Sequence, residues 1–179
     1  MTQTAINFAK ALYDLAAEED LQGRFLQELA VLQDAFLQEP AFVTLLGAPN
    51  LTKQERCGIL DNCFRDKVHI YVLNFMKLLT EKGGLRHFDD CCKAFRHIYN
   101  EENGILPVTA VTAVALTGDQ TQRLSQKLAQ ITGKTVELQN KVDPAVLGGV
   151  RLDYDGKRVD GTVQNRLDSV RDLLKNTVL

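Results

Sequence analysis

The first hundred residues carry apolar side chains at helical spacing. Along residues 21–38 the apolar positions recur every three or four residues: Leu21, Phe25, Leu29, Leu32 and Phe36. Similar patterns predict helices over residues 4–17, 67–80 and 85–100, and a short segment over residues 41–46. With the helix that begins after Thr52, this part of the chain is predicted to be all-helical.

The ends of these helices have recognisable residues. Thr52 followed by Glu55 is typical of a capping box, in which two backbone N–H groups at the start of a helix find side-chain acceptors. Pro40 is expected to end the second helix, because proline disfavours helix in the residue before it. Gly83 and Gly84 follow the fifth helix, and glycine is the usual residue just past a helix end.

The pattern changes after residue 104. Residues 105–114 are rich in β-branched side chains and largely alternate, which predicts a strand, with Pro107 tolerable near its start. A helix is expected over residues 119–131, with three apolar residues on one side: Leu124, Leu128 and Ile131. A second strand is expected over residues 134–142.

The remaining residues predict a hairpin and a last helix. Val150, Leu152 and Tyr154 share one face of a strand, and Asp155-Gly156 favours a tight turn that pairs this strand with residues 157–159. The last helix would carry its apolar residues on one stripe: Val163, Leu167, Val170 and Leu174. The predicted fold class is α+β, with an N-terminal six-helix bundle (residues 1–104) followed by a smaller α/β domain (residues 105–179). That second domain would have a mixed sheet and a C-terminal helix.

The composition excludes several classes of protein. A formal charge of −2 and an isoelectric point near 5.9 do not indicate a nucleic-acid-binding protein, and no nucleic-acid partner is expected. The longest apolar-rich stretch, Val68 to Leu79, is interrupted by polar residues and is too short to span a membrane. The first twenty residues lack the basic and apolar regions of a secretory signal, so we expect a cytoplasmic location.

Neither the cysteines nor the histidines predict a metal site. The four cysteines, at positions 57, 63, 91 and 92, form no CxxC pair, and we expect reduced thiols that act as small apolar residues. The three histidines, at positions 69, 87 and 97, have no partner at metal-ligand spacing. No metal, cofactor or catalytic residue is predicted.

The segment Thr132-Gly133-Lys134-Thr135 looks like the end of a phosphate-binding P-loop but fails two tests. The glycine that the motif requires five residues before the second one is replaced by Leu128. The motif also needs a strand before its loop and a helix after it, whereas the pattern here predicts the reverse order. We expect a plain turn, and Gly148-Gly149 likewise belongs to no dinucleotide-binding motif.

Two helices have more apolar surface than a small bundle needs. The first carries one stripe (Ala5, Ala9, Leu12 and Ala16) and a second beside it (Phe8, Ala11 and Leu15). The fifth carries a wide stripe: Val68, Tyr71, Val72, Phe75 and Leu79, with Met76 and Leu78 at its sides. Either both helices are central in the bundle, or they form a groove for an amphipathic helix from another chain.

Three blocks of sequence resemble the delta subunit of F-type ATP synthases, the bacterial relative of the mitochondrial oligomycin-sensitivity-conferring protein. Residues 8–16, FAKALYDLA, are similar to the family's start, and residues 74–85, NFMKLLTEKGGL, to a later segment in which Gly84 replaces the usual arginine. GGVRL at residues 148–152 and DGTVQNRL at residues 160–167 resemble its most specific signature, with Thr162 in place of serine. These blocks occur in order along nearly the whole chain.

The resemblance implies a non-catalytic stator subunit that links the catalytic head to the peripheral stalk and resists rotor torque during proton-driven ATP synthesis. Such a subunit lies on the cytoplasmic face of the cell membrane, held there through the complex. Its N-terminal bundle would hold the N-terminal helix of an alpha subunit in a groove, which by position uses Phe8, Ala11, Leu12, Leu15, Phe75, Leu78 and Leu79.

The C-terminal half would meet the C-terminal end of the b subunit. We expect Gly148, Gly149, Asp160 and Gly161 to have structural roles, with Asp160 or Thr162 capping the last helix. Two alternatives remain: a generic cytosolic helical adaptor, and a small nucleotide-binding enzyme.

Overall fold

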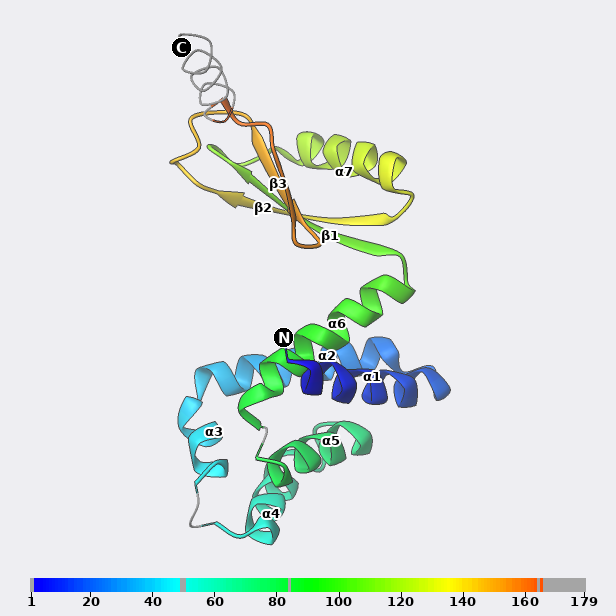
Figure 1. Cartoon of the computed structure of the whole chain (residues 1–179), viewed down its shortest axis with the longest axis vertical. Helices are drawn as coiled ribbons and strands as arrows, with labels where there is room; N and C mark the ends of the chain where they lie inside the picture. Colours follow the sequence, from blue (N-terminus) through cyan, green and yellow to red (C-terminus); the bar gives the residue numbers. More distant parts are fainter. Residues whose placement is uncertain (1, 49–50, 84, 164, 166–179) are drawn as a thin grey trace, which may run out of the picture. The chain divides into compact units, whose positions relative to one another are not determined.

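The computed structural model describes residues 2–48, 51–83, 85–163 and 165. The chain divides into two compact units, and the division falls between Tyr99 and Asn100. Helices occupy the first unit, whereas the second contains a sheet and one helix within the described residues (Figure 1). The fold is therefore α+β, as the sequence predicts.

Every helix predicted in the first unit is present, although two of them begin later than expected. The helices are α1 (Gln3–Glu18), α2 (Gln22–Gln38), α3 (Pro40–Leu46), α4 (Lys53–Phe64), α5 (Ile70–Glu81) and α6 (Phe88–Glu102). The predicted capping box is present: the Thr52 hydroxyl accepts from Glu55 N, and the Glu55 carboxylate accepts from Thr52 N at 2.8 Å. Thr2 caps α1 without a reciprocal partner: its hydroxyl accepts a hydrogen bond from Ala5 N.

Two helix starts differ from the expectation. α5 begins at Ile70 and not at Lys67, because His69 is its N-cap: Nδ1 of His69 accepts a hydrogen bond from Tyr71 N at 3.4 Å. The backbone N–H of His69 donates to the Glu28 carboxylate at 2.7 Å, which ties this turn to α2. α6 begins at Phe88, after a 3₁₀ turn over Leu85–His87 (η1).

The core of the first unit contains a cluster of aromatic rings and many aliphatic side chains. Phe36 lies at the centre of an aromatic cluster, with ring centroids 5.0 Å from Phe88, 5.9 Å from Phe42 and 6.1 Å from Phe64. Four separate elements supply these rings, so the cluster joins α2, α3, α4 and α6. The fully buried aliphatic side chains include Leu29, Leu32, Leu60, Leu73 and Met76.

A four-stranded mixed sheet forms the second unit (Figure 1). Its strands are β1 (Ile105–Thr112), β2 (Thr135–Val142), β3 (Val150–Tyr154) and β4 (Lys157–Asp160), in the order β2-β1-β3-β4. β1 pairs in parallel with β2, antiparallel β3 flanks β1 on the other side, and β4 pairs back on β3. α7 (Gly118–Thr132) connects the two parallel strands and packs against β2.

Two loops of this unit match their predicted roles. Asp155 (φ 46°) and Gly156 (φ 68°) both have the left-handed conformation that a tight hairpin turn requires. Gly133 (φ 68°) is the C-cap of α7 and leads directly into β2, so the Thr132–Thr135 segment runs from helix to strand. That order is opposite to a P-loop and confirms the plain turn.

The end of one strand was predicted wrongly, and one helix exposes an apolar residue. β1 ends at Thr112 and not at Val114. The chain turns after Thr112, whose hydroxyl donates to Val114 O at 2.7 Å, and this turn leaves Val114 74% exposed. Ile131 is 81% exposed, although Leu124 and Leu128 on the same helix are partly buried. Ile131 lies in the last turn of α7. The apolar stripe of this helix extends beyond the surface that the sheet covers.

The two glycine-containing segments of the second unit pack backbone to backbone. Gly149 has φ 86°, and a Cβ added there would lie 2.6 Å from Gly161 O. Gly161 N donates to Val150 O at 3.1 Å, and Val163 N donates to Gly148 O at 3.0 Å. Only glycine at position 149 fits this close approach.

Asp160 and Thr162 form a turn at the same place. Asp160 Oδ1 accepts from Thr162 N at 2.9 Å and from the Thr162 hydroxyl at 2.6 Å, and these hydrogen bonds lower the pKa of Asp160. The Thr162 hydroxyl accepts from Asn165 N at 3.2 Å. This is the geometry of an N-cap. Val163 and Asn165, at the start of the predicted last helix, are helical, and the part that would carry Leu167, Val170 and Leu174 lies outside the described residues.

Replacing Gly149 with alanine should destabilise the second unit by about 2 kcal/mol or more. The alanine would carry a positive φ, which costs roughly 1–3 kcal/mol, and its Cβ would collide with Gly161. Chemical denaturation followed by circular dichroism measures the change. Gly118→Ala is the matched control, because nothing lies within 4 Å of its Cβ position, and it should change stability by less than about 0.5 kcal/mol. Equal stabilities for the two variants would contradict this account of Gly149.

Candidate functional site

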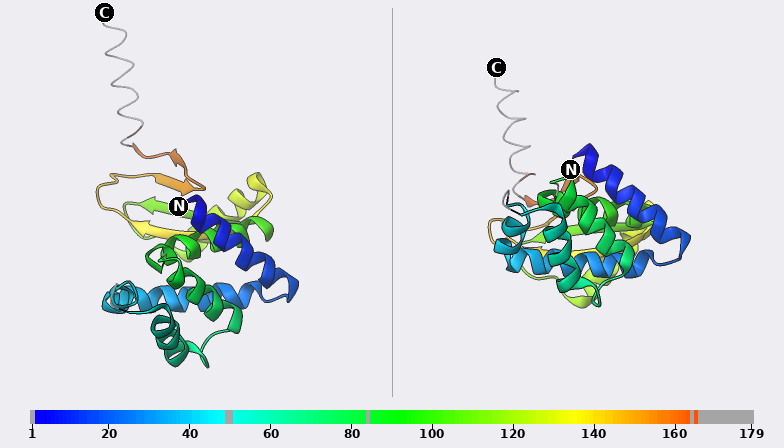
Figure 2. Two further views of the ribbon diagram at one scale, coloured as in Figure 1. Left: turned by 60° about the horizontal axis from the view of Figure 1, so that its bottom comes forward. Right: turned by 90° about the horizontal axis from the view of Figure 1, so that it is seen from below.

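A groove opens on the surface of the first unit between α1 and α5. The two helices contact each other, and Figure 2 shows the ribbon of this unit from two further sides. The hollow between the helices has a volume of about 230 Å³. Eight residues line it, four from each helix: Phe8, Ala11, Leu12, Leu15, Tyr71, Asn74, Phe75 and Leu78. We call this surface the groove.

The groove exists because both helices carry apolar residues on more than one side. On α1 the core side consists of Ala5, Ala9, Leu12 and Ala16, which are all buried. Leu15 lies on the neighbouring side of α1 and remains 42% exposed. On α5, Leu78 is also 42% exposed. The burial of one stripe therefore leaves the second stripe of each helix beside solvent.

Six of the seven residues predicted for the groove line it: Phe8, Ala11, Leu12, Leu15, Phe75 and Leu78. Leu79 does not, because it is only 1% exposed and points into the core side of α5. Tyr71 and Asn74 were missing from the predicted set. Tyr71 lies seven residues before Leu78 and Asn74 lies four residues before it, which places both on the same side of the helix. This spacing could have identified both residues.

Tyr71 fixes one end of the groove. Its hydroxyl donates a hydrogen bond to the Glu19 carboxylate at 2.8 Å, which joins the N-terminal end of α5 to the residue that follows α1. This hydrogen bond to Glu19 raises the pKa of Tyr71. The Phe25 ring lies 6.4 Å from the Tyr71 ring and 5.1 Å from the His69 ring, so the tyrosine is also held from the core side.

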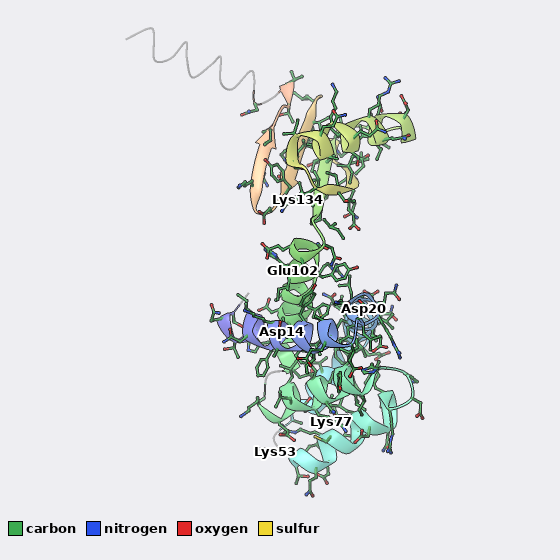
Figure 3. The ribbon with its side chains drawn as sticks, turned by 90° about the vertical axis from the view of Figure 1, so that its right-hand side faces the viewer. Asp14, Asp20, Lys53, Lys77, Glu102 and Lys134 are labelled. Atoms are coloured by element: carbon green, nitrogen blue, oxygen red, sulfur yellow. The ribbon has the colours of Figure 1, made fainter. Side chains whose placement is uncertain are left out.

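Charge around the groove is uneven. Asp14 and Glu18 are exposed on α1 near its C-terminal end, and Glu19 and Asp20 follow that helix. Figure 3 shows Asp14 on α1 and Asp20 just past its end. On α5, Lys77 is turned toward α4 and forms an ion pair with Asp61 at 2.6 Å. The Tyr71 end of the groove is therefore acidic.

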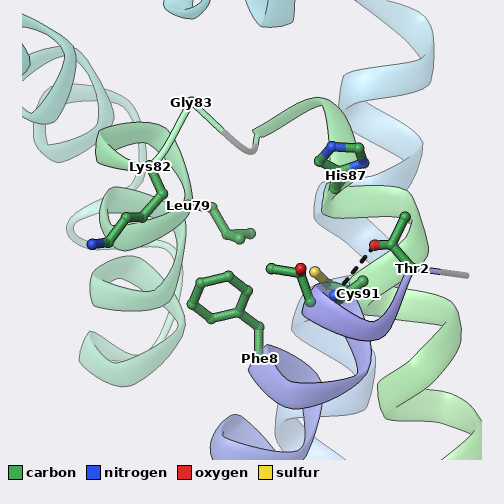
Figure 4. A pocket seen from close by; sticks show the side chains of 9 residues that line it. Thr2, Phe8, Leu79, Lys82, Gly83, His87 and Cys91 are labelled. Atoms are coloured by element: carbon green, nitrogen blue, oxygen red, sulfur yellow. Dashed lines mark hydrogen bonds between the residues drawn. The ribbon is translucent and has the colours of Figure 1, made fainter.

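A second hollow of about 240 Å³ lies at the opposite end of α1 (Figure 4). Its lining residues come from α1 and its N-cap, from the end of α5 and the segment that follows, and from η1 and α6: Thr2, Thr4, Ala5, Phe8, Leu79, Lys82, Gly83, His87 and Cys91. We call it the end pocket. Phe8 lines both hollows, and Leu79 and Cys91 form part of the apolar floor of this one.

The described part of the chain offers no group of three or more His, Cys, Asp or Glu side chains that could hold a metal ion. Among the described helices, no single one has both the length and the apolar composition of a membrane span. One pair, α2 and α3, meets these criteria together across a 95° bend. The arrangement at the groove favours the binding of an apolar surface over chemistry on a small molecule.

The comparisons with known proteins agree on one family. A family model described as ATP synthase delta (OSCP) subunit matches residues 4–174. "ATP synthase subunit delta" of Alkaliphilus oremlandii is 33% identical over 172 residues, which cover 96% of each chain. The protein of the same name from Lacticaseibacillus casei is 33% identical over 168 residues, covering 93% of this chain and 92% of its own.

A solved structure shares the fold. A chain of the Toxoplasma gondii mitochondrial ATP synthase hexamer superimposes with a TM-score of 0.75, covering 97% of this chain and 98% of its own. The two sequences are 20% identical, so this likeness concerns the fold alone.

The buried cysteines should resist modification in the folded protein. Burial raises the pKa of Cys91 to about 11 and that of Cys92 to about 12, and both side chains are nearly inaccessible. At pH 8 a thiol reagent should therefore modify only the partly exposed Cys57 and Cys63 at an appreciable rate. Peptide mapping after a timed reaction identifies the modified residues, and unfolding in urea should release all four. Rapid native modification of Cys91 would contradict the burial.

The same pKa values predict a loss of stability in alkali. The folded protein holds the two thiol protons more tightly than the unfolded chain, whose thiols titrate near pH 9. This contribution to stability is complete below pH 9 and is lost as the pH rises through about 11 to 12. The free energy of unfolding should fall less steeply above pH 9 in a Cys91→Ala/Cys92→Ala variant than in the parent.

Proposed function

The chain belongs to the ATP synthase delta (OSCP) subunit family, whose members are non-catalytic stator subunits of F-type ATP synthase, and on this premise we propose how it binds its neighbours. The groove holds the N-terminal helix of an alpha subunit. The residues that carry this contact are Phe8, Ala11, Leu12, Leu15, Phe75 and Leu78, with Tyr71 and Asn74 at the border. Leu79 supports the contact from beneath.

One observation carries the proposal: two large aliphatic side chains, Leu15 and Leu78, face solvent from adjacent helices around an apolar hollow. An amphipathic helix from a partner fits such a surface, because its apolar face can cover both side chains at once. Burial of apolar surface contributes roughly 25 cal/mol per Å², from which the cost of association is subtracted. The contact therefore depends on apolar complementarity along the groove.

The two units would serve different partners. We assign residues 1–104 to a six-helix bundle domain that meets the catalytic head, and residues 105–179 to an α/β domain that meets the C-terminal end of the b subunit. The second assignment draws support from exposed apolar side chains at one end of the sheet. Val114 and Val142 lie there, because Thr112 pairs with Val142 in the parallel ladder.

In this role the subunit holds the head against the torque of the rotor, so that rotation changes the catalytic subunits and does not turn the whole head. We place it on the cytoplasmic face of the cell membrane, where its association is peripheral and depends on the complex. A generic helical adaptor would also have a grooved bundle. The family match over residues 4–174 does not favour that alternative.

Replacing Ala11 with aspartate should weaken binding of the alpha N-terminal peptide at least tenfold. Ala11 is exposed in the free protein, so the carboxylate is hydrated before binding and is buried without a partner after it. Isothermal titration calorimetry of the full chain with the synthetic peptide measures the affinity. Circular dichroism should show an unchanged helix content.

Ala17→Asp is the matched control, because Ala17 is exposed on the same helix but does not line the groove. Its affinity for the peptide should equal that of the parent chain within a factor of two. An Ala11→Asp variant that binds as tightly as the Ala17→Asp variant would rule out the groove as the binding surface.

A further inference from the structure

Asn103 and Gly104 stand where the chain leaves α6 and enters β1. Asn103 is the only asparagine of the sequence that precedes a glycine. It lies in a turn just past Glu102, the last residue of α6, and is exposed. Gly104 has φ 62°, and nothing lies within 4 Å of the position that a Cβ would occupy there. No side chain on residue 104 therefore obstructs the approach of the Asn103 amide to the backbone nitrogen that follows it.

We infer that Asn103 is a site of spontaneous deamidation through a five-membered succinimide ring. Asparagine is one of the thermolabile side chains. The backbone nitrogen of Gly104 loses its proton and forms a bond to Cγ of Asn103, while the bond from Cγ to Nδ2 breaks and ammonia leaves with that proton. Water then opens the ring: at Cγ this gives aspartate, and at the backbone carbonyl carbon it gives isoaspartate, whose main chain runs through Cβ and Cγ. The reaction needs no enzyme and does not depend on the partner that the groove binds.

The backbone around Gly104 leaves its nitrogen weakly held. Gly104 N donates to Glu101 O at 3.2 Å, which is at the long end of the usual range, and the bond lies at the end of a helix, where fraying is common. This bond must open before the nitrogen can reach Cγ. The carbonyl of Gly104 points to the sheet instead, where it accepts from Thr135 N at 2.9 Å. The β1–β2 pairing therefore holds the far side of Gly104 and not the attacking nitrogen.

Other asparagines are placed less favourably for the same reaction. Each precedes a residue with a side chain, which hinders closure of the ring. Asn100 lies within α6, where the N–H of the next residue is bound to a carbonyl of the helix. The amide of Asn140 in β2 donates to Ala110 O at 2.9 Å and to the Thr112 hydroxyl at 2.8 Å. These residues should stay amides while Asn103 is converted.

Two Asp–Gly pairs, Asp155-Gly156 and Asp160-Gly161, can form the same ring with loss of water. Opening of that ring restores the original mass and charge. The carboxylate of Asp160 also accepts from Thr162 N and from its hydroxyl, while Gly161 N donates to Val150 O at 3.1 Å. A new negative charge with release of ammonia is thus specific to an asparagine.

Either product changes the link near the division between the two units. The new carboxylate joins Glu101 and Glu102 at the C-terminal end of α6, where the helix dipole disfavours negative charge. Isoaspartate also lengthens the main chain by one carbon just before the first hydrogen bond of the β1–β2 ladder, from Thr135 N to Gly104 O. We expect this hydrogen bond to open more often in the modified chain.

Incubation of the full chain at 37 °C and pH 8 tests the inference. The tryptic peptide of residues 97–123 contains both Asn100 and Asn103, and mass spectrometry follows each of them. Asn103 should be converted to aspartate and isoaspartate, which electron-transfer fragmentation distinguishes. Because glycine offers no steric hindrance, its rate should exceed that of Asn100 roughly tenfold or more. A parallel sample in urea gives the rate without the fold.

Three outcomes would overturn the inference. Equal rates at Asn100 and Asn103 would remove the role of the glycine. Conversion to aspartate without any isoaspartate would exclude the ring. An Asn103 that stays intact in the folded chain while the sample in urea is converted would show that the fold protects this position.

Variants of the glycine give an independent measurement. Gly104→Ala should slow the conversion of Asn103 roughly tenfold, because the added Cβ hinders attack by the nitrogen. Gly156→Ala is the matched control, since Gly156 also has a positive φ (68°) and nothing within 4 Å of its Cβ position. It should leave the rate at Asn103 unchanged. Equal rates in the parent chain and Gly104→Ala would contradict the mechanism.

Asn103→Gln removes the site without changing Gly104, and it replaces Gly104→Ala if circular dichroism shows that the alanine variant does not fold. Its longer side chain would have to close a six-membered ring, so position 103 should stay an amide throughout the incubation. Hydrogen exchange then measures the effect on the sheet. The Thr135 amide should exchange faster in the incubated parent chain than in the incubated Asn103→Gln variant. Equal exchange in the two, with isoaspartate present in the parent, would overturn the effect on the β1–β2 ladder.

Discussion

The first unit depends on a helix that is apolar on two sides and can bury only one of them. α1 turns small residues, Ala5, Ala9 and Ala16, toward the core, which lets its backbone approach the other helices closely. Leu12 and Tyr13 are buried beside these alanines, whereas Phe8 and Leu15 are left at the border of the groove. The rotation of α1 about its axis thus sets both the packing that stabilises the free protein and the apolar surface that stays open beside α5.

Much of the fold was predictable because the signals are local. The 3.6-residue periodicity of the helices, the Thr52–Glu55 capping box and the Asp155-Gly156 turn each depend on residues close together in sequence. The start of α5 was not predictable in the same way. His69 caps that helix while its backbone donates to Glu28, forty-one residues earlier, and no local pattern contains this contact. The exposure of Ile131 depends likewise on where the sheet ends beneath α7, which is a tertiary property.

The candidate site was predictable as a surplus of apolar positions, but its exact border was not. A stripe shows which residues share a side of a helix. The rotation of the helix about its axis decides which of these residues face the core and which face the groove. Leu78 and Leu79 are adjacent in sequence and fall on opposite sides of that division. The contact between Tyr71 and Glu19 joins residues fifty-two positions apart and could not be foreseen from spacing. It holds the ends of α1 and α5 together before any partner binds, so less conformational entropy is lost on association.

The pairing of β1 has a consequence for synthesis of the chain. β1 is an interior strand whose two neighbours, β2 and β3, come about 30 and 45 residues later. During translation the helices of the first unit all emerge before β1, so contacts such as that between Glu19 and Tyr71 can form while the second unit is still incomplete. β1, with its apolar Val108 and Val111, must then wait with both edges unpaired until the later strands appear. During that interval the unpaired edges of β1 are open to pairing with another chain, so the second unit is exposed to aggregation until β3 has been made.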